Sequence, residues 1–156
     1  MDLARGVKGV AWEDDAPHAT TRLMLAAMAE LGDGLRGRVV DVGTGDGVLA
    51  RAALAAGATE VVAIDRRAVP AIAGATTIVV DIADFTAAGF DVALANLPED
   101  VLHANAARLV GMARTAIVTG VRLPRAPALR RRLEAAGACV VRVAALDGWA
   151  AFVVDS

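Results

Sequence analysis

Apolar positions along this chain follow two patterns, short continuous runs and recurrence every three to four residues. Short, nearly continuous apolar runs bounded by glycine or polar residues predict buried strands, whereas the three- to four-residue spacing predicts helices. The predicted strands are 39–42, 60–65, 76–81, 90–96, 114–120, 139–146 and 149–154. The predicted helices are 18–31, 48–54, 99–113 and 126–136.

The order of these elements favours one fold class. Nearly continuous apolar strands that alternate with helices are typical of parallel sheets covered by helices on both faces. The last two strands break the alternation, because only Asp147-Gly148 separates them and Asp-Gly is a strong hairpin signal. We therefore predict an α/β protein with a Rossmann-like, seven-stranded, mostly parallel sheet and an antiparallel C-terminal hairpin.

Composition adds limits to this picture. A length of 156 residues fits one domain, 1–156, in which we expect 1–17 to form an irregular N-terminal lid segment. No apolar run approaches the roughly 20 residues that span a bilayer, and no long apolar region marks a signal peptide. The single cysteine, Cys139, has apolar neighbours that predict a buried strand thiol. We expect a cytoplasmic protein, because one cysteine cannot form an internal disulfide.

The strongest local signal is the glycine-rich segment Gly43-Thr44-Gly45-Asp46-Gly47, between the strand 39–42 and the helix 48–54. Glycine permits positive φ and close approach of a ligand, and the helix that follows offers free N–H groups. Asp65 ends the next strand, where a carboxylate can accept hydrogen bonds from the hydroxyls of a ribose. The pattern predicts a nucleotide-like ligand at the carboxyl ends of these strands.

Two ligand classes use such a loop. A dinucleotide site has the pattern G-x-G-x-x-G, but Val48 occupies the position of the third glycine. Arg66-Arg67, directly after Asp65, would suit the 2′-phosphate of NADP, so a dinucleotide stays open as an alternative.

The segment 41–47, together with Asp65 and the C-terminal hairpin, resembles the class I S-adenosylmethionine-dependent methyltransferases. This resemblance implies the strand order 3-2-1-4-5-7-6, with strand 7 antiparallel. It also implies that Asp65 binds the ribose and that Asp81-Ile82 meets the adenine of S-adenosylmethionine, whose product is S-adenosylhomocysteine. The cofactor-binding residues predicted in these segments are Asp41, Gly43, Thr44, Gly45, Gly47, Asp65, Arg66, Asp81 and Ile82.

Two further segments resemble the ribosomal-protein lysine methyltransferases, which modify a stalk protein of the large ribosomal subunit. The segment 18–23 is similar to their H-P-T-T-x-L motif, and 95–97 is similar to their A-N-I motif. By this resemblance Thr21 and Asn96 contact the cofactor. We expect the chain to lack the separate N-terminal substrate-recognition domain of that family.

Asn96 is the candidate catalytic residue. Strand 4 of this fold ends beside the methyl group to be transferred, and an Asn there can orient an attacking amine. The residues that follow, Pro98-Glu99-Asp100, are equally typical of a helix start. No single general base is indicated among Asp41, Glu99 and Glu13. No metal site is predicted.

The sequence thus predicts a methyltransferase that methylates the nitrogen of a small-molecule or protein amine. The acidic run Glu13-Asp14-Asp15 favours a cationic substrate, and Trp12 is a candidate lid residue. One alternative is a catalytically silent cofactor-binding subunit of a larger complex, and another is an RNA methyltransferase. The net charge of −2 and the 3% aromatic content count against a nucleic-acid partner. A homodimer or a partner subunit stays open.

Overall fold

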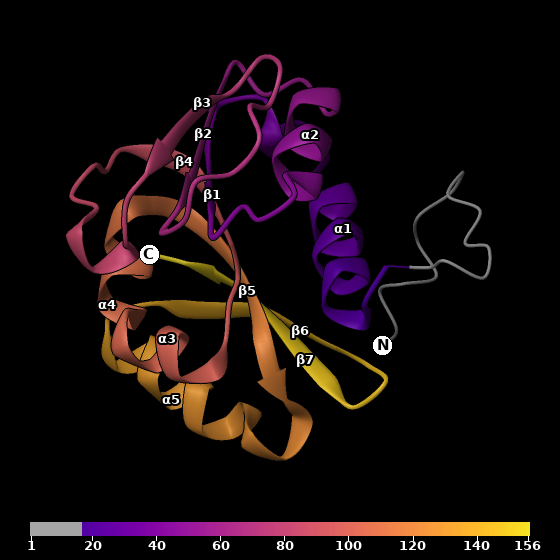
Figure 1. The fold of residues 1–156 in the computed structure, drawn as a ribbon. Helices are drawn as coiled ribbons and strands as arrows, with labels where there is room; N and C mark the ends of the chain where they lie inside the picture. The colour runs from indigo at the N-terminus through magenta and orange to yellow at the C-terminus, as the bar shows by residue number, and fades with distance from the viewer. Residues whose placement is uncertain (1–16) are drawn as a thin grey trace.

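The computed structural model describes residues 17–156, which form one layered α/β unit (Figure 1). The strands are β1 (Arg38–Val42), β2 (Glu60–Asp65), β3 (Thr76–Val79), β4 (Phe90–Asn96), β5 (Ala113–Arg122), β6 (Cys139–Leu146) and β7 (Trp149–Asp155). The α-helices are α1 (Ala19–Leu31), α2 (Val48–Ala55), α3 (Glu99–Ala104), α4 (Ala106–Met112) and α5 (Ala126–Ala135). Short 3-10 turns are η2 (Gly32–Leu35), η3 (Ile82–Asp84) and η4 (Leu123–Arg125).

The strands form one seven-stranded sheet in the order β3-β2-β1-β4-β5-β7-β6. All neighbours are parallel except β7, which runs antiparallel to both β5 and β6. The predicted fold class and strand order are confirmed. Asp147 and Gly148 join β6 to β7 with φ values of 50° and 79°, which is the backbone that a tight hairpin turn requires.

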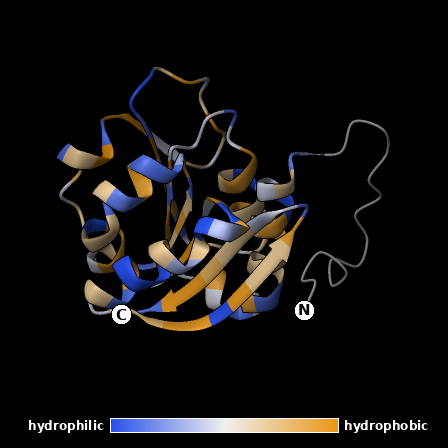
Figure 2. Ribbon diagram, turned by 90° about the horizontal axis from the view of Figure 1, so that it is seen from below, coloured by the Kyte–Doolittle hydropathy of each residue, from blue (hydrophilic) through white to orange (hydrophobic). Residues whose placement is uncertain are grey.

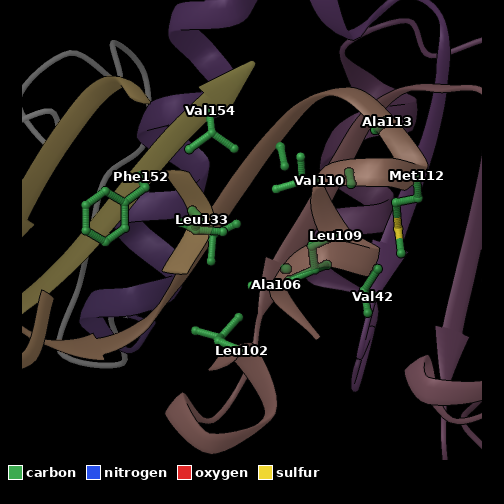
Figure 3. Close-up of a cluster of buried hydrophobic side chains, with 14 of the residues drawn as sticks. Val42, Leu102, Ala106, Leu109, Val110, Met112, Ala113, Leu133, Phe152 and Val154 are labelled. Carbon is green, nitrogen blue, oxygen red and sulfur yellow. The ribbon is translucent and has the colours of Figure 1, made fainter. Parts of the chain in front are cut away.

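Helices cover the sheet on both faces, with α1 and α2 on one side and α3, α4 and α5 on the other (Figure 1). The α5 side forms the larger apolar cluster, in which Leu133 of α5 and Phe152 of β7 are fully buried (Figure 3). On the other face, Met24 of α1 and Leu49 of α2 pack with Val39 of β1. Figure 2 shows mostly hydrophobic strands and hydrophilic residues concentrated on helices and loops.

The predicted helix 99–113 is wrong in one respect, because it is two helices that meet at Asn105. Asn105 has φ −118° and ψ 15°, outside the helical region, and its Nδ2 donates to the Val101 carbonyl at 2.9 Å. Asn side chains compete with the helical backbone for hydrogen bonds, which explains the break. The third strand ends at Val79, two residues earlier than predicted, because Asp81 accepts a hydrogen bond from the Ala83 N–H and caps η3.

The prediction of a buried thiol at Cys139 is also wrong. Cys139 is exposed at the start of β6, which lies at the edge of the sheet and, among residues 17–156, pairs only with β7. Val141 and Val143 on the same strand are 53% and 42% exposed. An apolar run does not reveal whether a strand is central or at an edge, and edge strands lack the cover that central strands receive.

Candidate functional site

A cavity of about 480 Å³ opens at the carboxyl ends of β1, β2 and β4. The strand order reverses between β1 and β4, which is the place where open α/β sheets bind ligands. The volume of the cavity lies within the usual range for small-molecule sites. The lining residues are Val42, Gly43, Ile64, Asp65, Arg66, Val80, Asp81, Ile82, Asn96, Leu97, Pro98, Asp100, Val101, Ala104 and Asn105.

The glycine loop connects β1 to α2 and reaches the cavity at Gly43. The N–H groups of Gly43 and Thr44 both donate to the Ile64 carbonyl, at 2.8 and 2.9 Å, so the loop is fastened to the end of β2. Gly43, Gly45 and Gly47 have φ values of 73°, 56° and 82°, which L side chains rarely adopt. A Cβ on Gly43 would overlap the side chain of Leu97, which lines the cavity. Glycine at position 43 therefore keeps this space open.

Asp65 connects this loop to the cavity. Its Oδ2 accepts a hydrogen bond from the Gly45 N–H at 3.0 Å, and its Oδ1 accepts one from the Arg67 N–H at 3.0 Å. A carboxylate oxygen can accept more than one hydrogen bond, so Asp65 keeps acceptor capacity for a ligand. The half-buried carboxylate lines the cavity, where the predicted ribose contact requires it.

Asp41 lies beneath the loop and is 1% exposed. Its Oδ2 accepts hydrogen bonds from Thr44 Oγ1 at 2.7 Å and from the Ala50 N–H at 3.1 Å. Burial raises the pKa of Asp41 to about 6, although these two hydrogen bonds oppose the shift. Neither Asp41 nor Thr44 lines the cavity, so both hold the loop from below.

Asn96 ends β4 and lines the cavity with Leu97 and Pro98. The Leu97 N–H donates to the Thr119 carbonyl of β5 at 3.1 Å, which fixes this turn against the neighbouring strand. Pro98 is the N-cap of α3. The predicted helix start at 98–100 and the predicted place of Asn96 at the cavity therefore coexist.

The structure brings six of the predicted cofactor residues to the cavity: Gly43, Asp65, Arg66, Asp81, Ile82 and Asn96. Thr21, Asp41, Thr44, Gly45 and Gly47 do not line it. Thr21 is half-buried in the first turn of α1. Trp12, the acidic run Glu13-Asp14-Asp15 and the predicted lid up to residue 16 lie outside the described residues.

Sequence reasoning missed one wall of the cavity, the face of α3 formed by Asp100, Val101 and Ala104, together with Asn105. Their spacing of one and four residues is that of a single helix face, and this could have indicated the wall. It also missed the apolar strand ends and the turn beside Asn96, which contribute Val42, Ile64, Val80, Leu97 and Pro98.

Charged side chains outside the cavity mostly pair locally. The carboxylate of Glu99 contacts both Arg125 and His103 at ion-pair distance. Arg142 pairs with Glu30 at 2.8 Å. Arg122 stacks on the Trp149 ring at 4.0 Å.

Within residues 17–156, no group of three or more His, Cys, Asp or Glu side chains is arranged to hold a metal ion. No helix in that range is long and apolar enough to cross a membrane.

Residues 15–156 match the family model described as "Ribosomal protein L11 methyltransferase (PrmA)". The chain belongs to this family. The match spans all described elements, including the glycine loop, the end of β4 and the C-terminal hairpin. The predicted resemblance to the ribosomal-protein methyltransferases is confirmed.

Known proteins extend this comparison. A ribosomal protein L11 methyltransferase from Syntrophotalea carbinolica is 40% identical over 93 residues, which cover 51% of this chain and 30% of that protein. The chain thus matches less than a third of the length of this relative.

Solved structures share the fold. A ribosomal protein L11 methylase from Lactobacillus delbrueckii subsp. bulgaricus has a TM-score of 0.78 at 21% identity, covering 95% of this chain and 82% of that one. A Burkholderia thailandensis 1,6-didemethyltoxoflavin-N1-methyltransferase with bound S-adenosylhomocysteine has a TM-score of 0.64 at 16% identity, covering 94% and 93%.

Proposed function

We propose that this chain binds S-adenosylmethionine and transfers its methyl group to an amine nitrogen of a protein substrate. One observation carries the proposal: Asp65 at the end of β2, Asp81 two residues after β3 and Asn96 at the end of β4 line a single cavity beside the glycine loop. Membership of the ribosomal protein L11 methyltransferase family supports it.

The cavity has the chemistry that this cofactor requires. Asp65 offers carboxylate oxygens for the ribose hydroxyls, and Asp81 offers an acceptor for the amino group of an adenine. Ile64, Ile82 and Leu97 supply apolar surface for the flat base. The missing Cβ at Gly43 leaves room beside Leu97, so the residues present fit the group.

S-adenosylmethionine, when bound, supplies an electrophilic methyl group on a sulfonium centre. The protein then has to position the acceptor and exclude water. In this proposal Asn96 orients the amine through its side-chain or backbone carbonyl, while Leu97, Pro98 and Val101 shield the site from solvent. The amine must lose a proton before it attacks, and solvent can accept that proton.

We propose ribosomal protein L11 as the substrate class, since the family and the Syntrophotalea carbinolica relative carry that name. Asp100 adds a carboxylate to the cavity lining on the α3 side. Among the described residues, the lining thus contains three carboxylates, Asp65, Asp81 and Asp100, and one cation, Arg66. This balance suits a cationic cofactor and a lysine side chain.

Two measurements, one after the other, test the proposed function. Calorimetry with S-adenosylhomocysteine should show saturable one-to-one binding, and an absence of heat would reject the cofactor assignment. Labelled S-adenosylmethionine should then transfer label to purified ribosomal protein L11. Binding without transfer to L11 or to any protein, RNA or small-molecule fraction of a lysate would instead favour a silent cofactor-binding subunit. Label in RNA alone would favour an RNA methyltransferase.

A further inference from the structure

A β-bulge in β5 lies directly behind the Asn96 turn. Thr119 pairs with Ala151 of β7 and Val121 pairs with Ala150, so the register shifts by one residue and Gly120 is the extra residue of β5. Gly120 has a φ of 123°, in the region that favours glycine. Bulges of this kind often occur next to active sites, where they direct a neighbouring segment.

A side chain at position 120 would meet the backbone of Leu97 rather than another side chain. A Cβ on Gly120 would overlap the Leu97 carbonyl oxygen and would lie 2.8 Å from the Leu97 carbonyl carbon. Backbone atoms cannot rotate away as the end of a side chain can, so the whole turn would have to move. Leu97 is also hydrogen-bonded to the bulge, because its N–H donates to the Thr119 carbonyl at 3.1 Å.

The bulge is also fixed from its other side. Thr119 is fully buried, and its Oγ1 donates to the Ala150 carbonyl of β7 at 2.6 Å. The bulge therefore holds the Asn96 turn against a strand that cannot shift independently of β7. At no other glycine between residues 17 and 156 would an added Cβ lie against the backbone of another segment.

We infer that Gly120 is a positioning residue of this site: the bulge in β5 sets where Asn96, Leu97 and Pro98 stand in the cavity wall. Gly120 itself does not line the cavity and acts only through Leu97. Its effect on catalysis rests on the proposed function, whereas its effect on the position of the turn does not.

The test compares Gly120→Ala with Gly137→Ala. Gly137 has a φ of 99° but no heavy atom within 4 Å of an added Cβ, so this control carries the backbone strain without the overlap. In NMR spectra of the ligand-free protein, Gly120→Ala should move the Asn96 side-chain amide and the Leu97 N–H signals. Gly137→Ala should leave both in place. Unmoved Asn96 and Leu97 signals in folded Gly120→Ala would overturn the inference.

A second measurement needs no variant to fold. In the wild-type protein the Leu97 N–H should exchange with solvent at least tenfold more slowly than an amide without a partner, because Thr119 accepts its hydrogen bond. Exchange as fast as that of an unbonded amide would show that the bulge does not hold the turn, and would also overturn the inference.

Kinetics add a readout that a purely structural role would not change. With labelled cofactor, Gly120→Ala should lower kcat roughly 100-fold, more than it raises KM for the acceptor, as expected for a small misplacement. Equal kcat values for Gly120→Ala and Gly137→Ala would contradict positioning. If the wild-type protein binds no S-adenosylhomocysteine, the proposed function fails, and the NMR comparison still decides the role of Gly120.

Discussion

The carboxylate of Asp65 accepts a hydrogen bond from the backbone N–H of Gly45 at 3.0 Å, joining the end of β2 to the glycine loop that follows β1. The glycine loop and Asp65 are separated in the chain by α2 and the length of β2, and this hydrogen bond joins them at the cavity. The same carboxylate lines that cavity, so one side chain both holds the loop and borders the cavity.

Replacing Asp65 by Ala should weaken binding of S-adenosylhomocysteine about 100-fold, because it removes a charged acceptor and frees the loop, at roughly 1.4 kcal/mol per factor of ten. Calorimetry checks this result. The matched control is Asp84→Ala, which removes an exposed carboxylate outside the cavity lining and should leave the affinity unchanged. Equal affinities for the two variants would contradict a ligand contact by Asp65.

Asp41 should make stability depend on pH. Its pKa of about 6 in the folded protein lies above the ordinary aspartate value of 3.8, so the folded protein keeps a proton on Asp41 at pH values where the unfolded chain has lost it. The contribution of Asp41 to the free energy of unfolding is fully present below about pH 4. It is lost as the pH rises towards 6, a change of about 3 kcal/mol.

The variant Asp41→Asn cannot ionise, and its Oδ1 can still accept the hydrogen bonds from Thr44 and Ala50. Urea unfolding at pH 4 and pH 7 should therefore show that this variant gains stability relative to the wild type as pH rises. A relative loss over the same interval would mean that the pKa of Asp41 is lowered in the folded protein.

Gly43→Ala should reduce ligand binding more than its loss of stability explains. An added Cβ overlaps the Leu97 side chain, which would have to swing within the cavity. Gly45→Ala has the same kind of positive φ but no neighbour within 4 Å, so it reports the backbone strain alone, about 1–2 kcal/mol. Thermal unfolding should show similar losses of stability for the two variants. Calorimetry should show weaker binding of S-adenosylhomocysteine for Gly43→Ala than for Gly45→Ala.

Leu133→Ala should destabilise the protein by about 2–5 kcal/mol, because Leu133 is fully buried in the cluster around Phe152 and its truncation leaves a cavity. Arg131→Ala, on the exposed side of the same helix, should change stability by less than about 0.5 kcal/mol. Denaturant unfolding of the two variants checks the prediction. A similar small effect for both would mean that α5 is not part of the cooperative core.

Much of the fold follows from local signals. The bounds of β2, β4 and β6 agree with the apolar runs, and the Asp147-Gly148 turn correctly predicts the antiparallel hairpin. These features depend on residues adjacent in the chain, so periodicity and turn chemistry reveal them. The break at Asn105 was not predicted, since it depends on whether one side chain bonds to its own helix.

The candidate site was predictable only where a motif marks a strand end. Gly43, Asp65, Asp81 and Asn96 each follow or end an apolar run, and each lines the cavity. Asp41 looked like a cofactor residue from its place in the motif, yet it is buried below the loop. Position in a motif does not state in which direction a side chain points.

Hydrophobic periodicity and glycine act over neighbouring residues, so the sequence predicts the order of strands and helices along the chain, the glycine loop and the closing hairpin. Only the packed structure shows that Cys139 is exposed at a sheet edge and that Gly120 lies against the Leu97 backbone. These relationships arise when segments distant in the chain pack together, and such contacts have no local pattern to predict them.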